Sequence, residues 1–566
     1  MFVKVIKVGS YTYLNLVESY RDDSGVSKHR VLYNFGRLDS LKMDQSFLNC
    51  VKKLCHLLEI PLLEDREKAA LADCGEAQML GYGHLAYARL WEKLGIGEIL
   101  DQIGKDSRCT TLNLSRTVLL MAVQHLLAPR SKLGTYERQG QYWGMEQVPL
   151  QHLYRALDKL AANKERIETE LFERNHLKLR QEVNVVFYDV TTFAFQSTDE
   201  DEVRRFGYSK DCKFNEVQVV MGLLLDAEGK PLGYELFAGN TCDSRTMVAS
   251  LENLKRKFRI RKVVIVADRG LNSRDNLSRI TEAGYGYLMA CRLRSMPEWV
   301  REQALDEAGY QAVGEGFRYK AIPYVNRFKD EGKNPREMEE QLVLSWSAER
   351  AAKDRADRER LIAKAHKMLK SPASIEASSK RGGKKYLKDA SGKLSNWALD
   401  EGKIASDVLL DGYYGIQTSE KSMSAREVMD AYHMLWRIED SFRVMKSTME
   451  VRPVFHWTPE RIRGHFAMCF LGFLMERTLE SLLPKDGEEW ENGSPERIRE
   501  ALLSMQLAKV EANGETLYLK TKNQPLGTQI FKAVGLKLPD NVSRTTDLKE
   551  RLSSIPQAYD GQITMF

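Results

Sequence analysis

The pattern of apolar and polar residues divides the chain into segments with different periodicities. The first 40 residues predict two strands, 11–19 and 26–35, because both are rich in β-branched and aromatic residues and a turn-forming Arg-Asp-Asp-Ser-Gly run separates them. From about residue 47 to 179 apolar residues recur at helical spacing. Three stretches show this most clearly: 77–94, 112–127 and 152–179. We therefore expect an N-terminal β-hairpin followed by a helical region.

A different pattern begins at residue 184. Short apolar runs bounded by polar residues are typical of strands buried in a sheet. The strands are 184–190, 216–225, 231–237, 262–268 and 285–291, with helices at 244–257 and 272–283. The order β-β-β-α-β-α-β predicts an α/β fold in which a mixed five-stranded sheet is flanked by helices.

The pattern beyond residue 294 is less regular. It predicts strands at 317–324, 341–346 and 408–417, a charged helix at 348–370 and an exposed loop at 371–395. Two long helices follow, 424–449 and 458–483. The first opens with a Ser424…Glu427 capping box and the second with a Thr cap before Pro. A helix (495–507), a hairpin (510–520) and a short helix (526–534) complete the prediction.

Composition narrows the class of protein. The chain has 566 residues, 43% hydrophobic and 29% charged, which excludes a disordered, collagenous or small disulfide-linked protein. Its net charge of +6 permits a polyanionic partner without demanding one. The eight cysteines form no C-x-x-C pair, which favours reduced thiols. The N-terminus lacks the apolar core of a secretory signal, and no apolar stretch is long enough for a bilayer. We expect a cytoplasmic protein with no membrane association.

Three carboxylates are placed where chemistry is expected. Asp189 lies inside an apolar strand, where an ionised carboxylate is costly unless it is paired or binds a cation. Asp268 ends a second apolar strand, at the carboxyl edge that ligand sites favour in α/β sheets. Glu439 lies within the helix 424–449, seven residues after Tyr432 and seven before Lys446. Seven residues are close to two helical turns, so these three side chains align on one stripe.

This set of residues suits a metal-dependent phosphoryl transfer. Mg²⁺ prefers oxygen ligands, and two aspartates with a glutamate can hold a pair of such ions. Tyr432 and Lys446 could then hydrogen-bond a neighbouring phosphate. Nucleic-acid backbones require basic surface nearby, and two basic runs supply it. The first comprises Lys255, Arg256, Lys257, Arg259, Arg261 and Lys262, and the second Lys380, Arg381, Lys384, Lys385, Lys388 and Lys393.

Three sequence segments carry a specific resemblance. Tyr188-Asp-Val-Thr-Thr-Phe, Val-Ala-Asp268-Arg-Gly-Leu and Tyr432…Glu439…Lys446 resemble the DDE transposases of bacterial insertion sequences. The branch with a Tyr–Arg–Glu–Lys motif and a β-rich insertion before the glutamate fits best. The resemblance implies an RNase H-like core, catalytic and metal-binding Asp189, Asp268 and Glu439, and cleavage and joining of DNA with two Mg²⁺ ions, which Mn²⁺ can replace.

The resemblance also implies an organisation and partners. The domains are a β-hairpin (1–45), a helical DNA-end-binding region (46–180), the first part of the RNase H-like core (181–294), an insertion (295–407), the second part with the catalytic helix (408–483) and a C-terminal tail (484–566). The partners are double-stranded DNA, as terminal inverted repeats and as target, and a second copy of the chain in a homodimer. The location implied is the bacterial cytoplasm, in association with the nucleoid.

One position departs from the family motif. An Arg follows the Tyr by three residues in the family, whereas this chain has Leu435. Arg437 lies about 200° around the helix from that position, and Arg443 lies one turn after Glu439. The sequence leaves open which arginine takes the role. With the basic residues Lys255, Arg256, Lys257, Lys384 and Lys385, we expect Tyr432, Lys446, Arg437 and Arg443 to contact DNA phosphates.

Simpler interpretations compete with these roles. A single Asp after an apolar strand is more often a turn or cap residue, and only the ordered set of three carboxylates outweighs this. Tyr432 could belong to the core, Lys446 could be a surface lysine, and His433 and His465 fit structural or exposed positions because the histidines show no ligand spacing. The rival functions are an RNase H-like nuclease that does not join ends, a domesticated DNA-binding protein without activity, and a two-carboxylate glycosidase.

Overall fold

The computed structural model divides into two compact units. One comprises Met1–Met79, Leu507–Thr521 and Pro539–Arg551, and the other Leu80–Gln506, Lys522–Leu538 and Leu552–Phe566. The structure describes residues 1–553 except 59, 61–76, 108–110, 178–184, 208–214, 242–245, 248–249, 251–255, 259–262, 330–334, 371–374, 376–381, 390–396, 450–455, 484–492 and 513–514. Much of the predicted helix 244–257 and of the loop 371–395 lies outside these residues.

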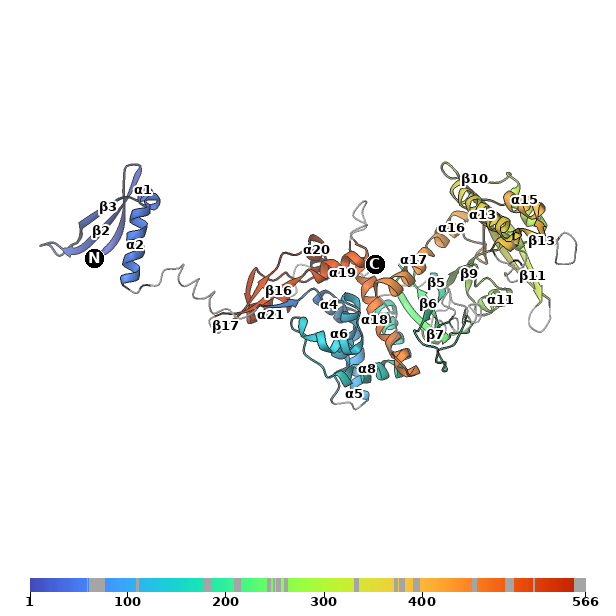
Figure 1. Ribbon diagram of the computed structural model, residues 1–566, viewed down its shortest axis with the longest axis horizontal. Coiled ribbons are helices and arrows are strands. Elements are labelled where there is room, and N and C mark those ends of the chain that lie inside the picture. Colours follow the sequence, from blue (N-terminus) through green and yellow to red (C-terminus); the bar gives the residue numbers. More distant parts are fainter. Residues whose placement is uncertain are drawn as a thin grey trace. The chain divides into compact units, whose positions relative to one another are not determined.

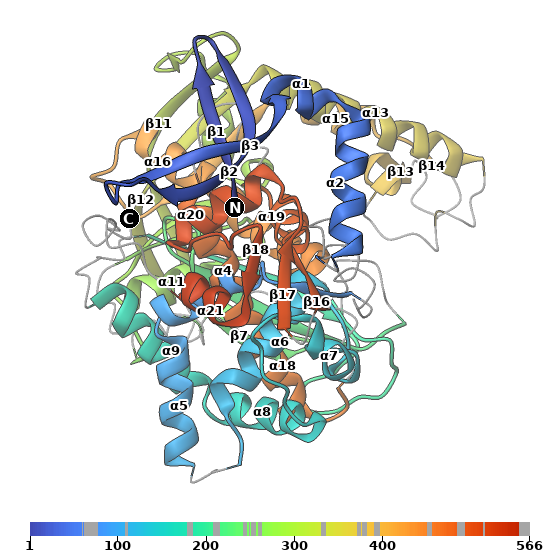
Figure 2. The same cartoon turned by 90° about the vertical axis from the view of Figure 1, so that its left-hand side faces the viewer.

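The first unit begins with an antiparallel sheet (Figures 1 and 2). Its strands are β1 (Phe2–Val8), β2 (Tyr11–Arg21) and β3 (Ser27–Arg37), in the order β1-β2-β3. The predicted hairpin is therefore confirmed, and β1 adds a strand that the sequence did not predict. The helices α1 (Leu38–Met43) and α2 (Gln45–Leu57) follow, with Asp44 capping α2.

The tail of the chain forms a second small sheet. Its order is β18-β17-β16-β4, from β4 (Gln78–Gly81), β16 (Gln506–Ala512), β17 (Glu515–Lys520) and β18 (Val542–Arg544), before α21 (Thr545–Ser553). The predicted hairpin 510–520 is β16 and β17.

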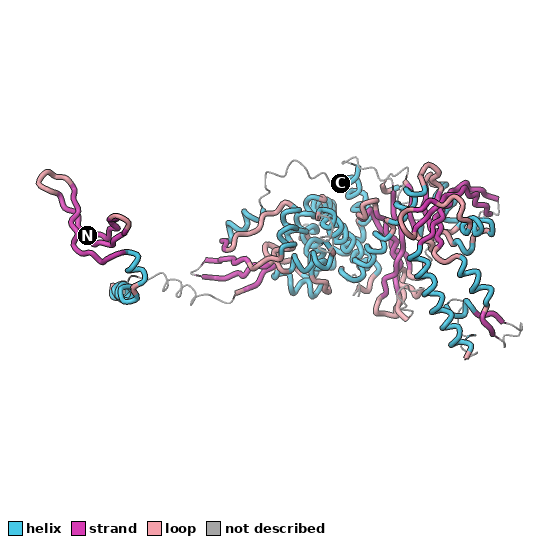
Figure 3. Tube along the Cα trace, turned by 90° about the horizontal axis from the view of Figure 1, so that it is seen from above, coloured by secondary structure: helices cyan, strands magenta, loops and turns pink. Residues whose placement is uncertain are grey.

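The second unit is built on a mixed sheet, whose strands are magenta in Figure 3. Its central part has the order β7-β6-β5-β8-β9. These strands are β5 (Val185–Ala194), β6 (Gln218–Leu225), β7 (Pro231–Ala238), β8 (Val264–Ala267) and β9 (Gly286–Ala290). β5, β6 and β7 are antiparallel neighbours, whereas β5, β8 and β9 are parallel. α11 (Arg274–Glu282) connects β8 to β9. This arrangement is the mixed α/β, RNase H-like core that the sequence predicts.

The sheet is wider than the five strands predicted. Nine strands of the described chain pair in the order β10-β11-β12-β15-β9-β8-β5-β6-β7. The additional strands are β10 (Gln311–Ala312), β11 (Phe317–Lys329), β12 (Pro335–Ser347) and β15 (Tyr413–Thr418). β15 pairs antiparallel with β9 and covers the edge that β9 would otherwise expose, and the β11–β12 hairpin adds to the other side of β15.

Helices and two short strands separate β12 from β15. They are α13 (Ala348–Leu369), β13 (Leu387–Asp389), β14 (Trp397–Leu399) and α15 (Glu401–Leu409). The predicted strand 408–417 is shorter than expected because α15 runs into its first residues. Gly412 then turns the chain into β15 with φ +83°, and a Cβ at this position would lie 2.7 Å from the Ser347 carbonyl oxygen.

A helical layer packs on the sheet through α18 (Pro459–Leu482). The other helices of this layer are α4 (Leu85–Lys93), α5 (Ile96–Asp106), α6 (Leu114–Leu127), α7 (Lys132–Arg138), α8 (Leu150–Ala162) and α9 (Lys164–Phe172). α18 contacts α4, α6 and α8 and also β7 (Figure 1). The ring centre of Phe466 lies 5.2 Å from that of Phe193 on β5. The ring centre of Phe470 lies 5.3 Å from that of Tyr234 on β7. Among the described helices, none combines the length and the apolar character that a membrane span requires.

The predicted helix 424–449 is interrupted. It forms α16 (Ala425–His433), α17 (Trp436–Arg443) and a π-helical turn at Val444–Thr448. The predicted capping box of Ser424 and Glu427 is present. Between α16 and α17 the amides of Leu435, Arg437 and Ile438 donate to carbonyls three residues earlier, as in a 3₁₀ turn. Tyr432 and Glu439 therefore do not share one regular α-helix.

Candidate active site

Asp189 and Asp268 are adjacent across two parallel strands. The register pairs Tyr188 of β5 with Ala267 of β8, and each aspartate is the next residue. Neighbouring strands lie about 4.8 Å apart, and successive side chains alternate between the two faces of a sheet. Asp189 and Asp268 therefore emerge on the same face, at the carboxyl end of β8.

The opposite face of these strands is a hydrophobic core. Val186 and Tyr188 of β5, with Ile265 and Ala267 of β8, belong to one buried cluster. The alternation leaves the two aspartates on the other face, where Asp268 is exposed and Asp189 is half-buried. The alternation of side chains along the strands thus places both carboxylates on the face opposite this cluster.

Glu439 reaches this region on α17. Ile438, Ser441 and Phe442 form the buried side of α17, which packs against β5, while Glu439 is exposed. The pKa of Tyr432 is raised by burial and then by Tyr414, and the negative charges of Asp268 and Glu439 raise it further. A single hydroxyl that responds to both carboxylates indicates that Asp268 and Glu439 approach the same point from sheet and helix.

Tyr414 is a site residue that sequence reasoning missed. Its hydroxyl lies 2.9 Å from the hydroxyl of Tyr432. Burial raises the pKa of Tyr414, and the charge of Asp268 adds to this effect. The guanidinium of Arg350 lies 4.2 Å from the centre of the Tyr414 ring. The pairing of β15 with β9, which is distant in the chain, brings Tyr414 near Asp268.

Lys446 lies over the aspartate face of β5. Its ammonium is 5.8 Å from the centre of the Phe193 ring, four residues after Asp189 on the same strand. The π-helical turn carries this lysine. Positions 189 and 193 share a face because side chains alternate, so Lys446 and Asp189 are on the same side of the sheet.

The two candidate arginines have different surroundings. Arg437 is half-buried and donates a hydrogen bond of 2.6 Å to the Ala227 carbonyl. Arg443 is exposed and pairs with Asp440, whose other oxygen lies 2.7 Å from Arg477. Leu435, which stands at the motif position, is buried at the interruption between α16 and α17.

The first basic run differs from the exposed surface that we expected. Lys257 is buried and lies 3.1 Å from Glu168 and 2.9 Å from Glu235. Arg256 is exposed and makes hydrogen bonds of 3.0 and 2.9 Å to Glu165. Lys255, Arg259, Arg261 and Lys262 lie outside the described residues. The sequence could not reveal this pairing because Glu165 and Glu168 lie some 90 residues earlier.

Some residues of the second basic run make contacts within the protein. Lys385 pairs with Asp407 at 2.5 Å, and Lys384 lies 5.6 Å from the centre of the Trp397 ring. Lys388 is exposed, whereas Lys380, Arg381 and Lys393 lie outside the described residues.

A different set of cations lies beside Asp268. Four arginines line one cavity together with Tyr414: Arg269, Arg292, Arg294 and Arg350. All four are exposed. Arg269 and Arg292 make no ion pair with any residue that the structure describes, whereas Arg294 approaches Asp407 at 3.6 Å and Arg350 approaches Asp354 at 3.9 Å. The signal in the sequence was the position of Arg269, Arg292 and Arg294 just after the strands β8 and β9.

The carboxylates fit a divalent metal ion. Asp189, Asp268 and Glu439 offer oxygen ligands, which magnesium and manganese prefer. Asp189 and Asp268 have adjacent positions in the sheet register, and Asp268 and Glu439 are exposed. Among the described residues, the ligand atoms of these three carboxylates do not all lie within 4.8 Å of one another.

The fold defines the class, an RNase H-like protein, in which Asp189 and Asp268 are neighbours in the sheet and α17 packs against β5. The chain belongs to the transposase DDE domain family, whose model matches residues 181–475, just over half of the chain. Residues 3–58 match the N-terminal domain of IS1634 family transposases. The protein is thus a DNA transposase of the insertion-sequence type, an enzyme of polynucleotidyl transfer that binds DNA and uses a divalent metal ion.

Comparison with individual proteins adds little to this assignment. No curated protein matches the chain. Among solved structures, it is similar to a piggyBac transposase in a synaptic complex with hairpin DNA. The two chains share 9% identity over 87% of this chain and 90% of the other, with a TM-score of 0.34.

Proposed function

We propose that Asp189, Asp268 and Glu439 are the catalytic triad and hold two Mg²⁺ ions, which Mn²⁺ can replace. The observation that carries this proposal is the register of β5 and β8, which makes the two aspartates neighbours on one face. The charges of Asp268 and Glu439 both raise the pKa of Tyr432, which supports Glu439 as the third residue of the triad. Bound metal supplies Lewis-acid stabilisation of the charge that develops on the reacting phosphate.

The side chains around the carboxylates orient the DNA phosphate. Tyr432 remains protonated because its pKa is raised, so its hydroxyl can donate a hydrogen bond throughout the neutral pH range. Tyr414 holds that hydroxyl at 2.9 Å and fixes its direction. Lys446 supplies a positive charge from the other side of the carboxylates, over Phe193. Positioning of this kind accounts for much of the catalysis in phosphoryl transfer.

The arginine-lined cavity is the proposed contact for the DNA backbone. Guanidinium groups bind phosphate oxygens with two parallel hydrogen bonds, so Arg269 and Arg292 are suited to a phosphodiester beside Asp268. Arg443, Arg437, Lys384 and Lys385 remain proposed contacts, and of these Arg443 is the most exposed. Lys257 is excluded from this surface because it is buried against Glu168.

The remaining partners follow from the reaction. We propose that residues 1–180 recognise the terminal inverted repeats and that two copies of the chain hold two element ends together. The match of residues 3–58 to an insertion-sequence N-terminal domain supports a role of this region in the transposition reaction. In the proposed reaction, water cleaves a phosphodiester at the element end, and the freed 3′-hydroxyl attacks target DNA.

The test is an assay of both steps with purified protein. Double-stranded DNA that carries the element's terminal repeats is incubated with Mg²⁺ and a target plasmid. We expect nicks at the ends and covalent joining to the target. Nicks without joined products would instead support a nuclease of the same fold, and binding without cleavage would support a DNA-binding protein that has lost its activity.

A further inference from the structure

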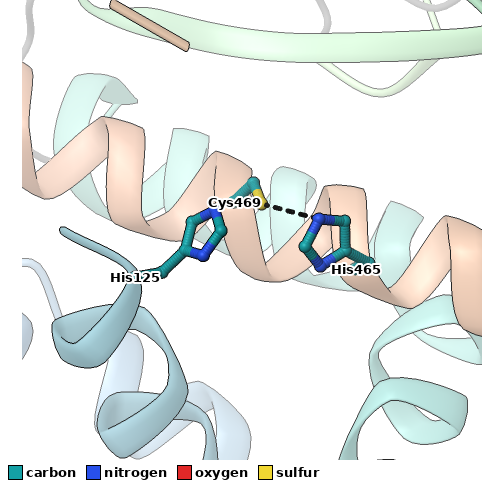
Figure 4. Close-up of side chains that lie close together, drawn as sticks. All are labelled: His125, His465 and Cys469. Atoms are coloured by element: carbon teal, nitrogen blue, oxygen red, sulfur yellow. Dashed lines mark hydrogen bonds between the residues drawn. The ribbon is translucent and has the colours of Figure 1, made fainter. Parts of the chain in front are cut away.

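Three metal-binding side chains meet in the helical layer, away from the carboxylate site. They are His125 of α6 with His465 and Cys469 of α18, and their ligand atoms all lie within 4.8 Å of one another. Figure 4 shows the imidazole of His125 approaching from α6 toward the two side chains of α18. All three residues are buried. No ligand spacing is visible in the sequence around His465, because the other imidazole of the group, His125, lies 340 residues earlier in the chain.

The geometry matches that of a tetrahedral zinc site. His465 and Cys469 are four residues apart on one helix, the spacing at which two ligands share a face. The distance between Cys469 Sγ and His465 Nε2 is 3.6 Å. Zn–S and Zn–N bonds of about 2.3 and 2.0 Å at a tetrahedral angle place sulfur and nitrogen about 3.5 Å apart. The side chains of Cys469 and His465 therefore need little movement to bind the same ion.

His125 supplies an independent observation. Its side chain is 5% exposed, and neither ring nitrogen has a hydrogen-bond partner among the residues that the structure describes. Its ring lies 5.5 Å from that of His465 in an edge-to-face arrangement. Buried polar atoms without partners are costly and rare, and metal coordination would satisfy a nitrogen of this imidazole.

We propose that His125, His465 and Cys469 bind one Zn²⁺ ion, with Cys469 as the thiolate. Imidazole and thiolate ligands select zinc over magnesium, so this site and the carboxylate site take different metals. His456 is a neighbouring imidazole, with its ring 5.3 Å from that of His465, but it lies outside this group of three. The ion would join α6 to α18, the helix whose Phe466 packs on Phe193 of β5. Its role is therefore structural, in the support of the catalytic sheet.

One buried cation opposes this ion. Lys132 of α7 is 5% exposed. Burial is the main cause that lowers the pKa of both His125 and His456, and the charge of Lys132 lowers it further.

The test measures bound zinc in the full-length protein. The background carries Cys50→Ser and Cys55→Ser, because these cysteines of α2 are not buried and could bind zinc on the surface. After dialysis against metal-free buffer, we expect one zinc per chain in this protein and in the control Cys291→Ala, a buried cysteine elsewhere. Cys469→Ala and His125→Ala should lose the zinc. An equal zinc content in Cys469→Ala, or no zinc in the background protein, would overturn the proposal.

A second measurement does not depend on how the variants fold. Co²⁺ that replaces zinc in the background protein should give tetrahedral absorption bands and a thiolate-to-cobalt charge-transfer band. Asp268→Asn in the same background should retain the zinc and these bands, because the carboxylate site is separate. An octahedral cobalt spectrum without thiolate character would contradict the assignment.

Discussion

Two tyrosine hydroxyls pair with each other close to the proposed catalytic carboxylates. Tyr432 and Tyr414 come from α16 and β15, and their oxygens are 2.9 Å apart. The charge of Asp268 raises the pKa of both hydroxyls, and the charge of Glu439 also raises the pKa of Tyr432. Their raised pKa keeps both protonated, so the pair can orient a phosphate or a carboxylate without adding negative charge.

The first prediction concerns these hydroxyls. Tyr432→Phe should slow strand transfer by roughly 10- to 100-fold, because a hydrogen bond to a charged group contributes about 1.5–3 kcal/mol. Single-turnover kinetics on pre-cleaved ends measures the rate. Tyr414→Phe should have a smaller effect, since it removes only the support for Tyr432. Equal rates in wild type and Tyr432→Phe would mean that this hydroxyl has no part in the reaction.

A second prediction at this scale concerns a buried acid in α18. Glu476 accepts a hydrogen bond of 2.5 Å from Tyr87, and burial together with the charge of Glu480 raises its pKa to about 8. The folded state therefore binds this proton more tightly than the unfolded chain, whose carboxyl has a value near 4.5. The resulting stability is present below about pH 4.5 and is lost as the pH rises through 8.

Urea unfolding at several pH values tests this. Between pH 5 and 8.5 the free energy of unfolding should fall in wild type, and Glu476→Gln should remove part of that fall. Glu460→Gln, on the exposed end of the same helix, is the matched control and should keep the wild-type slope. An identical pH dependence in Glu476→Gln would show that the carboxyl is ionised in the folded protein.

Among the secondary-structure elements, the register of β5 and β8 explains the position of the aspartates, whereas a continuous helix 424–449 does not explain the positions of Tyr432, Glu439 and Lys446. The paired aspartates were predictable, because each ends or interrupts an apolar strand and parallel strands share a carboxyl edge. The Tyr432–Glu439–Lys446 stripe assumed a continuous helix, whereas a 3₁₀ turn and a π-helical turn break it. Local sequence signals did not indicate these changes. Tyr414 and the arginine-lined cavity depend on the pairing of β15 with β9, which is a long-range contact.

The third prediction separates structural from DNA-binding basic residues in the first run. Lys257→Met should destabilise the protein by about 3 kcal/mol, because within the described part of the chain it leaves the buried Glu168 with Lys164 as its one cationic partner. Arg256→Met breaks an exposed pair with Glu165 and should cost less than about 1 kcal/mol. Urea denaturation measures both. A loss of DNA affinity without a loss of stability in Lys257→Met would instead favour a phosphate contact.

The fourth prediction concerns the arginine-lined cavity beside Asp268. Arg292→Ala should weaken DNA binding and reduce the slope of log affinity against log salt by about 0.9, the value for one lost phosphate contact. Arg360→Ala removes an exposed arginine of α13 that pairs with Asp357, and it should leave the slope unchanged. Fluorescence anisotropy over a range of salt concentrations gives both slopes. An unchanged slope in Arg292→Ala would remove this cavity from the DNA-binding surface.

For DNA binding, the distribution of charge over the molecule is more informative than its net charge. A total of +6 hides an arginine-lined cavity that includes Arg269, the residue after Asp268. Many of the other basic residues are paired in ion networks, as Lys257 and Lys385 are. The sequence predicted the transposase class from an ordered set of short motifs. It could not show which basic residues remain available to DNA, since their partners are distant in the chain.

The central claim is that Glu439 completes a triad with Asp189 and Asp268. Its most direct test is the strand-transfer rate of Glu439→Gln with pre-cleaved element ends and Mg²⁺, beside Asp430→Asn, an exposed acid on α16. Glu439→Gln should abolish strand transfer while DNA binding and thermal stability stay as in wild type, and Asp430→Asn should be fully active. A wild-type rate in Glu439→Gln would contradict the triad.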